Sequence, residues 1–584
     1  MENLKYTEIL QKNKELTSKV SGPLYRVTIL SNITVNSLSE ILQYGIRLNN
    51  LNPEIVFGNF DNIVQDSANC KDSNLVIIFY DALSIIDNLS AFFDSFDDSS
   101  YDDLKSKLLN EVDIIWNNLR DNPVVIFNKF SSAFITQNSL CSTKSERLAN
   151  ELNQYLLEKR PKNTSLVDID KIVLSLGVKA SFDQRLYLSS KAPYTLSFLK
   201  SYTEAINPVI RRNSGKLKKA IIFDCDNTLW KGIIGEDGLL GIDMSANSPS
   251  GRPFHKVQQI AVFLSKVGVI VGLCSKNNGA DVDEVLTKHE DTVLKEDNIV
   301  IKKVNWEDKA ANLKSIADEL NIGVDSLIFV DDSSFEINLI KELLPDVLCV
   351  QVPTNLNDYP ELVLKTAYSY LNLDVNKEDL KKTEIYKQQF KREDSREKFE
   401  SVESYLASLQ IQLSVSIDDL SVLSRVTQLT QKTNQFNLTT RRYTEGQIQK
   451  FMENDNSHVF AATVNDRFGA SGLTAVCIVK RDSQNPQHAF IDTLLMSCRI
   501  IGRNIEFALV RHILCWLKEH DFHFVHSEFV PTKKNDQVQK FYDGIGFQLI
   551  RSAENSNYYS MDISKIQIPK FDYINISNEI FTKD

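Results

Sequence analysis

The sequence predicts a multidomain α/β protein made of three blocks. Two blocks alternate short apolar runs with amphipathic stretches of helical length, a pattern typical of parallel α/β sheets. The second block also places polar residues directly after several apolar runs, which predicts a doubly wound sheet with a functional edge. The third block follows a highly charged segment and combines alternating strands with one long helix, as in an α+β domain.

The first block covers residues 1–205 and should form a parallel sheet. Helix-length amphipathic segments separate its apolar runs, so consecutive strands can lie parallel with helical crossovers between them. The strand-like runs are residues 25–30, 75–80, 123–128 and 165–169.

The second block covers residues 216–375 and should form a doubly wound core. Strands are expected at 219–223, 269–274 and 327–330, where the apolar runs are nearly continuous, as in strands buried on both faces. A helix is expected at 309–320. Only 46 residues separate Thr228 from Ser275 and 33 separate Ser275 from Lys309, so there is no room for a large cap and the site should be open.

A charged helical linker is expected at residues 376–403, and the third block at 404–584. Its strands should lie near residues 458–463, 473–481, 489–497 and 523–530, with the long helix near 503–520.

Composition excludes several classes of protein. Of 584 residues, 42% are hydrophobic and 24% are charged, and the net charge of −11 argues against a general nucleic-acid binder. Residues 1–20 lack the apolar core of a signal peptide, and no apolar run is long enough to span a bilayer. Eight cysteines without metal-ligand spacing fit a reducing compartment. We therefore expect a cytoplasmic protein with neither membrane nor nucleic acid as a partner.

The strongest chemical signal is Asp224 and Asp226, directly after a buried strand. Ligands bind at the carboxyl ends of parallel strands. Two carboxylates there repel each other, and Mg²⁺, which prefers carboxylate and phosphate oxygens, resolves the repulsion. One carboxylate can then attack phosphorus while the other moves the proton.

Further polar residues follow in an order that supports a phosphoryl-transfer site. Ser275 and Asn277 follow the next strand and can hold phosphate oxygens, and Lys309 begins a helix and can neutralise developing charge. Asp331 and Asp332 follow a third strand and can supply metal ligands.

This order resembles the haloacid dehalogenase superfamily, and the string at residues 223–238 resembles its FkbH-like branch, subfamily IIIC. The resemblance implies that Asp224 is the nucleophile, Asp226 the acid/base and Lys309 the residue that stabilises charge. The implied phosphate-binding residues are Thr228, Ser275 and Asn277, and the implied Mg²⁺ ligands are Asp224, Asp226, Asp331 and Asp332. Lys231 and the pair Ser333–Ser334 depart from the family pattern without removing a catalytic element.

Two strings of the third block, residues 430–443 and 497–503, also look FkbH-like, and the order of elements resembles the GNAT acetyltransferase fold. In that fold a glycine turn opens a helix whose free N–H groups bind the pyrophosphate of coenzyme A. The resemblance implies a site for coenzyme A or for a carrier-bound phosphopantetheine arm. The candidate residues are Arg499, Gly502, Arg503, Asn535 and Tyr542. Acetyl transfer and a purely binding role both stay open, with binding favoured.

The first block resembles the SGNH-hydrolase-like domain that precedes the phosphatase core in this family. It contains no histidine, and a serine hydrolase needs an imidazole to take the serine proton, so a scaffold or binding role is expected.

The family resemblance spans nearly the whole chain and implies a combined phosphatase and glyceryl transferase. Such an enzyme takes a three-carbon unit from 1,3-bisphosphoglycerate, removes phosphate and loads a glyceryl thioester on an acyl carrier protein for polyketide-type biosynthesis. The alternative is a phosphatase fused to an active acetyltransferase. An acidic carrier needs a local basic surface, for which residues 211–219 and the pair Arg441–Arg442 are candidates.

An enzyme thiol could accept the acyl group and split the transfer into two steps. Cys274 and Cys498 are the candidates, ahead of Cys225, whose thiolate nearby carboxylates would suppress. Burial of Cys274 as core is the competing interpretation.

Overall fold

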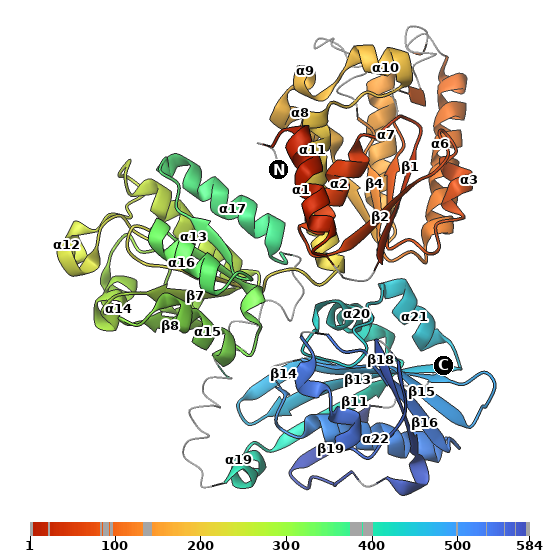
Figure 1. The fold of residues 1–584 in the computed structure, drawn as a ribbon, viewed down its shortest axis with the longest axis vertical. Helices are drawn as coiled ribbons and strands as arrows, with labels where there is room; N and C mark the ends of the chain where they lie inside the picture. The colour runs from red at the N-terminus through yellow and green to blue at the C-terminus, as the bar shows by residue number, and fades with distance from the viewer. Residues whose placement is uncertain are drawn as a thin grey trace. The chain divides into compact units, whose positions relative to one another are not determined.

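The structure is a computed structural model that describes residues 4–20, 24–81, 84–85, 93, 97–131, 143–373, 388, 401–497, 500–532, 534–553, 555–566 and 568–579. The chain forms two compact units, Met1–Ser214 with Tyr443–Gln447, and Gly215–Arg442 with Ile448–Asp584. One β-sheet belongs to the first unit and two belong to the second (Figure 1). No helix in these described ranges combines the length and the apolar character needed to cross a bilayer. The expected linker helix falls almost entirely outside them.

The first unit contains a parallel five-stranded sheet in the order β2-β1-β3-β4-β5, as predicted for an α/β block. Alternate residues of its central strand face opposite sides: Leu75 and Ile77 join one core, Val76 and Ile78 the other. Helices α2 and α11 pack on the first core, and α6 and α7 on the second. The strands are β1 (Leu24–Ser31), β2 (Asn52–Phe57), β3 (Leu75–Phe79), β4 (Val125–Asn128) and β5 (Thr164–Val167). The helices are α1 (Tyr6–Thr17), α2 (Leu38–Arg47), α3 (Ile63–Ser67), α6 (Asp98–Leu119), α7 (Lys144–Lys159), α8 (Ile169–Leu176), α9 (Val178–Ser181), α10 (Gln184–Ser190) and α11 (Leu196–Asn213).

The second unit begins with another parallel five-stranded sheet, in the order β10-β9-β6-β7-β8. Ile221 and Phe223 of its central strand point into a core with α13, α14 and α17, while Ala220 and Ile222 point into a core with α15 and α16. Both faces are therefore covered, which explains the continuous apolar runs. The strands are β6 (Ala220–Phe223), β7 (Ile270–Ser275), β8 (Ile301–Val304), β9 (Leu327–Asp331) and β10 (Leu348–Gln351). The helices are α12 (Ile234–Gly241), α13 (Arg252–Lys266), α14 (Gly279–Lys288), α15 (Lys309–Glu319), α16 (Ser334–Leu343) and α17 (Tyr359–Tyr370).

The second sheet of this unit is mixed, in the order β17-β18-β16-β15-β14-β13-β11-β19, with β12 paired to β15. The neighbours β15 and β16 run parallel and are connected by α22. The alternating strands and the long helix expected here are present, whereas β17 was not predicted because it is exposed along its whole length and shows no alternation. The strands are β11 (Ile411–Ile417), β12 (Phe436–Asn437), β13 (Ser457–Asp466), β14 (Gly469–Arg481), β15 (His488–Met496), β16 (Phe524–Phe529), β17 (Gln548–Ala553), β18 (Ser556–Asp562) and β19 (Ile574–Glu579). The helices are α19 (Val402–Ser408), α20 (Leu423–Lys432), α21 (Glu445–Glu453), α22 (Ile505–Glu519) and α23 (Phe541–Gly544).

Candidate active site

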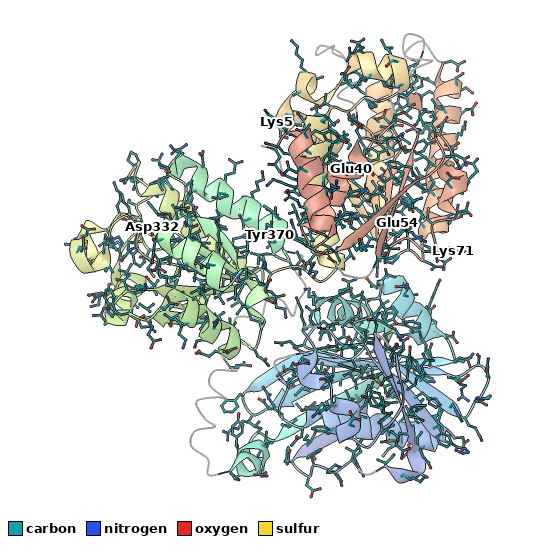
Figure 2. The ribbon with its side chains drawn as sticks, viewed as in Figure 1. Lys5, Glu40, Glu54, Lys71, Asp332 and Tyr370 are labelled. Carbon is teal, nitrogen blue, oxygen red and sulfur yellow. The ribbon has the colours of Figure 1, made fainter. Side chains whose placement is uncertain are left out.

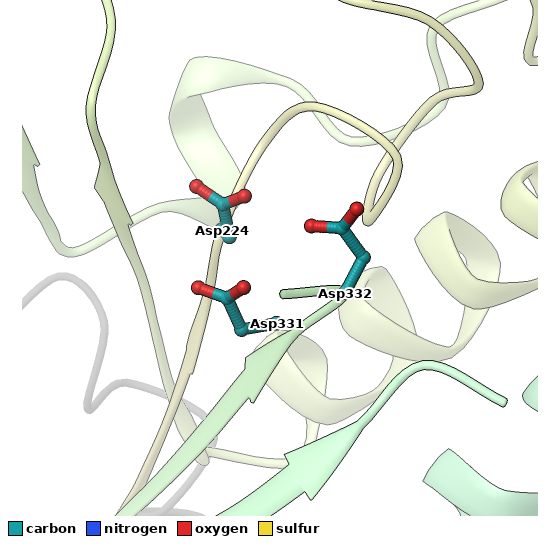
Figure 3. Close-up of side chains that lie close together, drawn as sticks. All are labelled: Asp224, Asp331 and Asp332. Carbon is teal, nitrogen blue, oxygen red and sulfur yellow. The ribbon is translucent and has the colours of Figure 1, made fainter. Parts of the chain in front are cut away.

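Three carboxylates meet where the neighbouring strands β6 and β9 end. The two strands pair in parallel with Phe223 opposite Val330, so Asp224 emerges beside Asp331 and Asp332. Oxygens of the three carboxylates all lie within 4.8 Å of one another (Figure 3). Asp224 is 5% exposed and Asp331 is 0% exposed, whereas Asp332 is less buried and is labelled in Figure 2. The structure thus brings three of the four expected metal ligands together.

Lys309 is the cation of this cluster. It begins α15, where the Asp308 side chain caps the helix by accepting N–H groups of the first turn. The Lys309 Nζ atom lies 2.6 Å from Asp331 Oδ2 and 3.1 Å from Asp224 Oδ1. Burial lowers the pKa of Lys309, but the two carboxylates raise it by more, so the ammonium stays charged.

One ammonium does not balance three carboxylates. Burial raises the pKa of Asp224 to about 6; Lys309 opposes this rise and Asp331 adds to it. Burial also raises the pKa of Asp331 and of Asp332. When all three are ionised, the cluster holds three negative charges against one positive charge, an excess of two. A divalent cation that prefers oxygen ligands would remove this excess, so the residues present fit Mg²⁺.

Asp226 lies next to this cluster, but its carboxylate is directed elsewhere. Its Oδ1 accepts the indole N–H of Trp230 at 2.8 Å and the backbone N–H of Ile234 at 3.0 Å. Its Oδ2 accepts an N–H of Asn277 at 2.9 Å. The Asp226 carboxylate is therefore absent from the group of close carboxylates found among the described residues, and its expected role as a ligand gains no support from this geometry.

The expected phosphate-binding residues surround the same strand ends. Ser275 ends β7 and accepts an N–H of Asn277 on Oγ at 3.2 Å, and it also hydrogen-bonds to Asp224. Thr228 is fully buried, and its hydroxyl has no hydrogen-bond partner within the described part of the chain. Buried hydroxyls are normally hydrogen-bonded, so an unpaired one here is available to a bound ligand.

Two positioning residues were missed by the sequence reasoning. Tyr359 of α17 is fully buried and donates its hydroxyl to the carbonyl of Thr228 at 3.0 Å. Trp230 holds Asp226 through its indole N–H. Trp230 belongs to the string at residues 223–238, so the local sequence carried a signal for it. Tyr359 is 131 residues away from Thr228, and no local pattern could reveal this contact.

The structure favours the core interpretation of Cys274 over its role as an acyl-accepting thiol. Cys274 is 0% exposed and packs in the core with Ala220, Ile222 and Phe329, on the α15 and α16 side of the sheet. Burial raises the pKa of its thiol far above the usual value. Cys225 is equally buried, with its pKa raised in the same way. A buried neutral thiol is a poor nucleophile, so neither cysteine suits the role.

Three of the candidate residues for coenzyme A that the structure describes are buried or paired within the fold. Arg503 is ion-paired with Asp466 at 3.0 Å. Asn535 is 0% exposed and both ends of its amide hydrogen-bond to backbone groups, and Tyr542 is 1% exposed in the hydrophobic core. Gly502, with φ of 82°, lies in the turn before α22, as expected. The fifth candidate, Arg499, and the candidate acyl thiol Cys498 lie outside the described residues.

The candidate basic surface at Arg441 and Arg442 is also corrected. Arg441 is ion-paired with Asp492 and Glu528, at 2.7 and 2.6 Å. Burial lowers the pKa of Arg442 to about 10, and its guanidinium donates to the carbonyl of Gln431. Both guanidinium groups are therefore engaged by groups of this chain.

In the first unit, β1 ends at Ser31. The hydroxyl of Ser31 donates to the carbonyl of Ile33 at 2.8 Å. The first histidine of the sequence is His255, so the unit itself contributes no imidazole to activate this serine.

The fold of the chain is similar to that of a solved phosphatase-domain protein. The N-terminal part of the protein BF1531 from Bacteroides fragilis, which contains a phosphatase domain and was solved in complex with Mg, is 24% identical. The match covers 63% of this chain and 99% of that chain, with a TM-score of 0.55. The shared fold supports the assignment of the parallel α/β sheets.

Smaller matches involve acetyltransferases. The ribosomal-protein-S18-alanine N-acetyltransferase from Escherichia coli is 12% identical, with 26% of this chain and 94% of that chain covered and a TM-score of 0.21. An acetyltransferase from Thermus thermophilus is 10% identical, and the match covers 26% of this chain and 99% of that chain, with a TM-score of 0.21. No protein-family model matches the sequence, and no curated protein does.

Proposed function

We propose that the chain is a Mg²⁺-dependent phosphatase of the haloacid dehalogenase type, with Asp224 as its nucleophile. The observation that carries the proposal is the cluster of Asp224, Asp331 and Asp332, which keeps an excess of two negative charges after Lys309 has been counted. Mg²⁺ held by these three carboxylates would supply charge neutralisation for a phosphate dianion. The similar fold of the Mg-bound phosphatase-domain protein is consistent with this assignment.

Asp224 and Asp226 have separate roles in the proposed reaction. An Oδ atom of Asp224 attacks phosphorus, the bond from phosphorus to the leaving oxygen breaks, and Asp226 gives its proton to that oxygen. Water then attacks the aspartyl phosphate, Asp226 takes a proton from the water, and the Asp224–phosphorus bond breaks to release phosphate. The three N–H donors on Asp226 fix its carboxylate in one orientation for both proton transfers.

Polar groups at the neighbouring strand ends hold the phosphoryl oxygens in this scheme. Ser275 and Asn277 already contact Asp224 and Asp226, and the unpaired hydroxyl of Thr228 can donate to a phosphoryl oxygen. Lys309 stabilises the charge that develops on those oxygens.

The test of this proposal is phosphate release by the purified chain. Asp224→Asn should lower the rate by about 10³-fold or more, because an amide is a poor nucleophile. Asp318→Asn on the exposed side of α15 is the matched control and should leave the rate unchanged. A fully active Asp224→Asn protein would show that the site is elsewhere.

We further propose, from the motif resemblance alone, that the enzyme loads a glyceryl unit from 1,3-bisphosphoglycerate on an acyl carrier protein. The flanking domains would then be SGNH-like and GNAT-like parts of the same assembly. Intact-mass analysis of carrier proteins incubated with enzyme, Mg²⁺ and bisphosphoglycerate tests this finer proposal. A glyceryl adduct supports it, whereas phosphate release without an adduct leaves a phosphatase without acyl transfer.

A further inference from the structure

Strands β15 and β16 of the mixed sheet separate from each other halfway along their length. They pair in parallel from His488 opposite Phe524 to Ile491 opposite Ser527. Beyond that point β15 continues to Met496 and β16 continues to Phe529, and the described residues of the two strands no longer pair with each other. Diverging parallel strands leave backbone N–H and C=O groups that need other partners. An extended ligand that carries amides could bind there by adding to the edge of a strand.

The chain itself fills this cleft with residues 436–441, which we name the wedge segment. Its first two residues form β12 and pair antiparallel with the end of β15. The N–H of Leu438 then donates to the carbonyl of Leu494 on β15 at 3.1 Å, and its carbonyl accepts the N–H of Val530, just past β16, at 2.8 Å. One residue of the wedge segment thus bridges both strands.

Side chains hold the wedge segment at the point where the strands separate. The Arg441 guanidinium bonds Asp492 of β15 at 2.7 Å and Glu528 of β16 at 2.6 Å. The hydroxyl of Thr439 donates to the carbonyl of Asp492 at 3.0 Å. Asn535 donates through Nδ2 to the carbonyls of Asn437 and Val530, each at 2.9 Å. The wedge segment is therefore fastened at both ends and along its length.

The helix that follows β15 shows a related feature. Glu506 lies in the first turn of α22 and is 8% exposed. Burial raises the pKa of its carboxyl, and the backbone N–H groups of Glu506 and Gly502 oppose that rise. Free N–H groups at a helix start are where an external anion would bind. Here the carboxylate of Glu506 already lies at the helix start.

We propose that the wedge segment is the resting occupant of the cleft between β15 and β16, and that a pantetheine chain can enter the cleft only when the wedge segment leaves it. A pantetheine chain is extended and carries two amides, which need the same groups of β15 that Leu438 and β12 now use. The anionic end of coenzyme A would also compete with the Glu506 carboxylate. This inference does not depend on the phosphatase proposal.

Hydrogen exchange on the full-length protein tests whether the wedge segment occupies the cleft at rest. Peptides that contain the Leu438 and Val530 amides should exchange as slowly as peptides from the central strand β14. Rapid exchange of the wedge segment in the free protein would overturn the proposal, because the cleft would then be open at rest.

Equilibrium dialysis with coenzyme A, repeated with phosphopantetheine, tests whether a pantetheine chain enters the cleft only when the wedge segment leaves it. Either no binding, or binding accompanied by loss of protection in the wedge segment, supports the proposal. Saturable binding that leaves the wedge segment fully protected would overturn it, because the ligand would then coexist with the supposed occupant.

Arg441→Met gives a graded test, because it removes both ion pairs and keeps an unbranched apolar side chain. Exchange of the wedge segment should become about tenfold to a hundredfold faster, as expected for the loss of charge-assisted hydrogen bonds. Arg481→Met is the matched control, since Arg481 contacts Pro486 and Phe522 rather than the wedge segment. Equal protection in the two variants would contradict the role of Arg441.

Discussion

Two places in the molecule bring together carboxylates from two neighbouring parallel strands. One is the carboxyl end of the β6–β9 pair, and the other is the point where β15 and β16 separate. The negative charge is balanced differently at the two places. At the first, Asp224, Asp331 and Asp332 face one cation among the described residues, Lys309. At the second, Asp492 and Glu528 face two cations, Arg441 and Lys480.

The difference separates a site that needs a ligand from a site that is already satisfied. Excess buried charge and an unpaired hydroxyl on Thr228 cost stability unless something binds. In the mixed sheet the wedge segment supplies the missing partners from within the chain. Changes at the first region should therefore reduce activity, and changes at the second should reduce stability.

The largest expected effect is on activity at the first region. Lys309→Met should reduce phosphate release by roughly 10²- to 10³-fold, because the charge on the transferring phosphoryl oxygens loses the ammonium that pairs with Asp224 and Asp331. Steady-state kinetics with a phosphate monoester measure the change. Lys314→Met on the exposed face of the same helix is the control. Equal rates for the two variants would remove Lys309 from the site.

The second prediction concerns pH and the metal-free protein. The pKa of Asp224 is raised to about 6 in the folded state, above its unfolded value, so its contribution to stability is present at low pH and is lost as the pH rises through 6. The loss should amount to roughly 3 kcal/mol between pH 4 and pH 7.

Chemical denaturation at several pH values, with chelator or with Mg²⁺, measures this effect. Mg²⁺ should restore the stability near neutral pH, because it favours the ionised carboxylates. Asp224→Asn should flatten the pH dependence without metal. A wild-type profile that is flat between pH 4 and pH 7 would contradict the charge excess.

The third prediction addresses the second region. Asn535→Ala should lower the free energy of unfolding by about 2 kcal/mol, because it leaves the buried carbonyls of Asn437 and Val530 without this donor. Denaturant unfolding measures the change. Phosphate release per folded molecule should stay at the wild-type level, and a parallel loss of activity would show that the two regions are not independent.

The smallest effect is expected for Glu506→Gln. Burial raises the pKa of Glu506, so the wild-type protein loses stability as the pH rises through that pKa, and the neutral glutamine does not. The variant should gain stability relative to wild type as the solution goes from acidic to neutral pH. A constant difference in unfolding free energy across this range would show that Glu506 does not titrate in the fold.

Much of the candidate site followed from local sequence. An apolar run predicts a buried strand, and a polar residue after it must appear at the carboxyl edge of a parallel sheet. That reasoning placed Asp224, Ser275 and Asp331 correctly at neighbouring strand ends, and Lys309 at the start of a helix. It could not assign the direction of Cys274, because alternation along a strand end allows either face and only the packing of α15 and α16 decides it.

The sequence by itself determined the parallel α/β sheets and the edge at which the acidic residues gather, because these depend on the spacing of apolar and polar residues along short stretches of chain. Tertiary structure alone decided which carboxylates share one space, which way Asp226 turns, and that residues 436–441 lie between two strands that come about 50 to 90 positions later. The physical reason is that strand pairing and charge pairing join residues distant in sequence, and no local pattern encodes which distant partner will arrive.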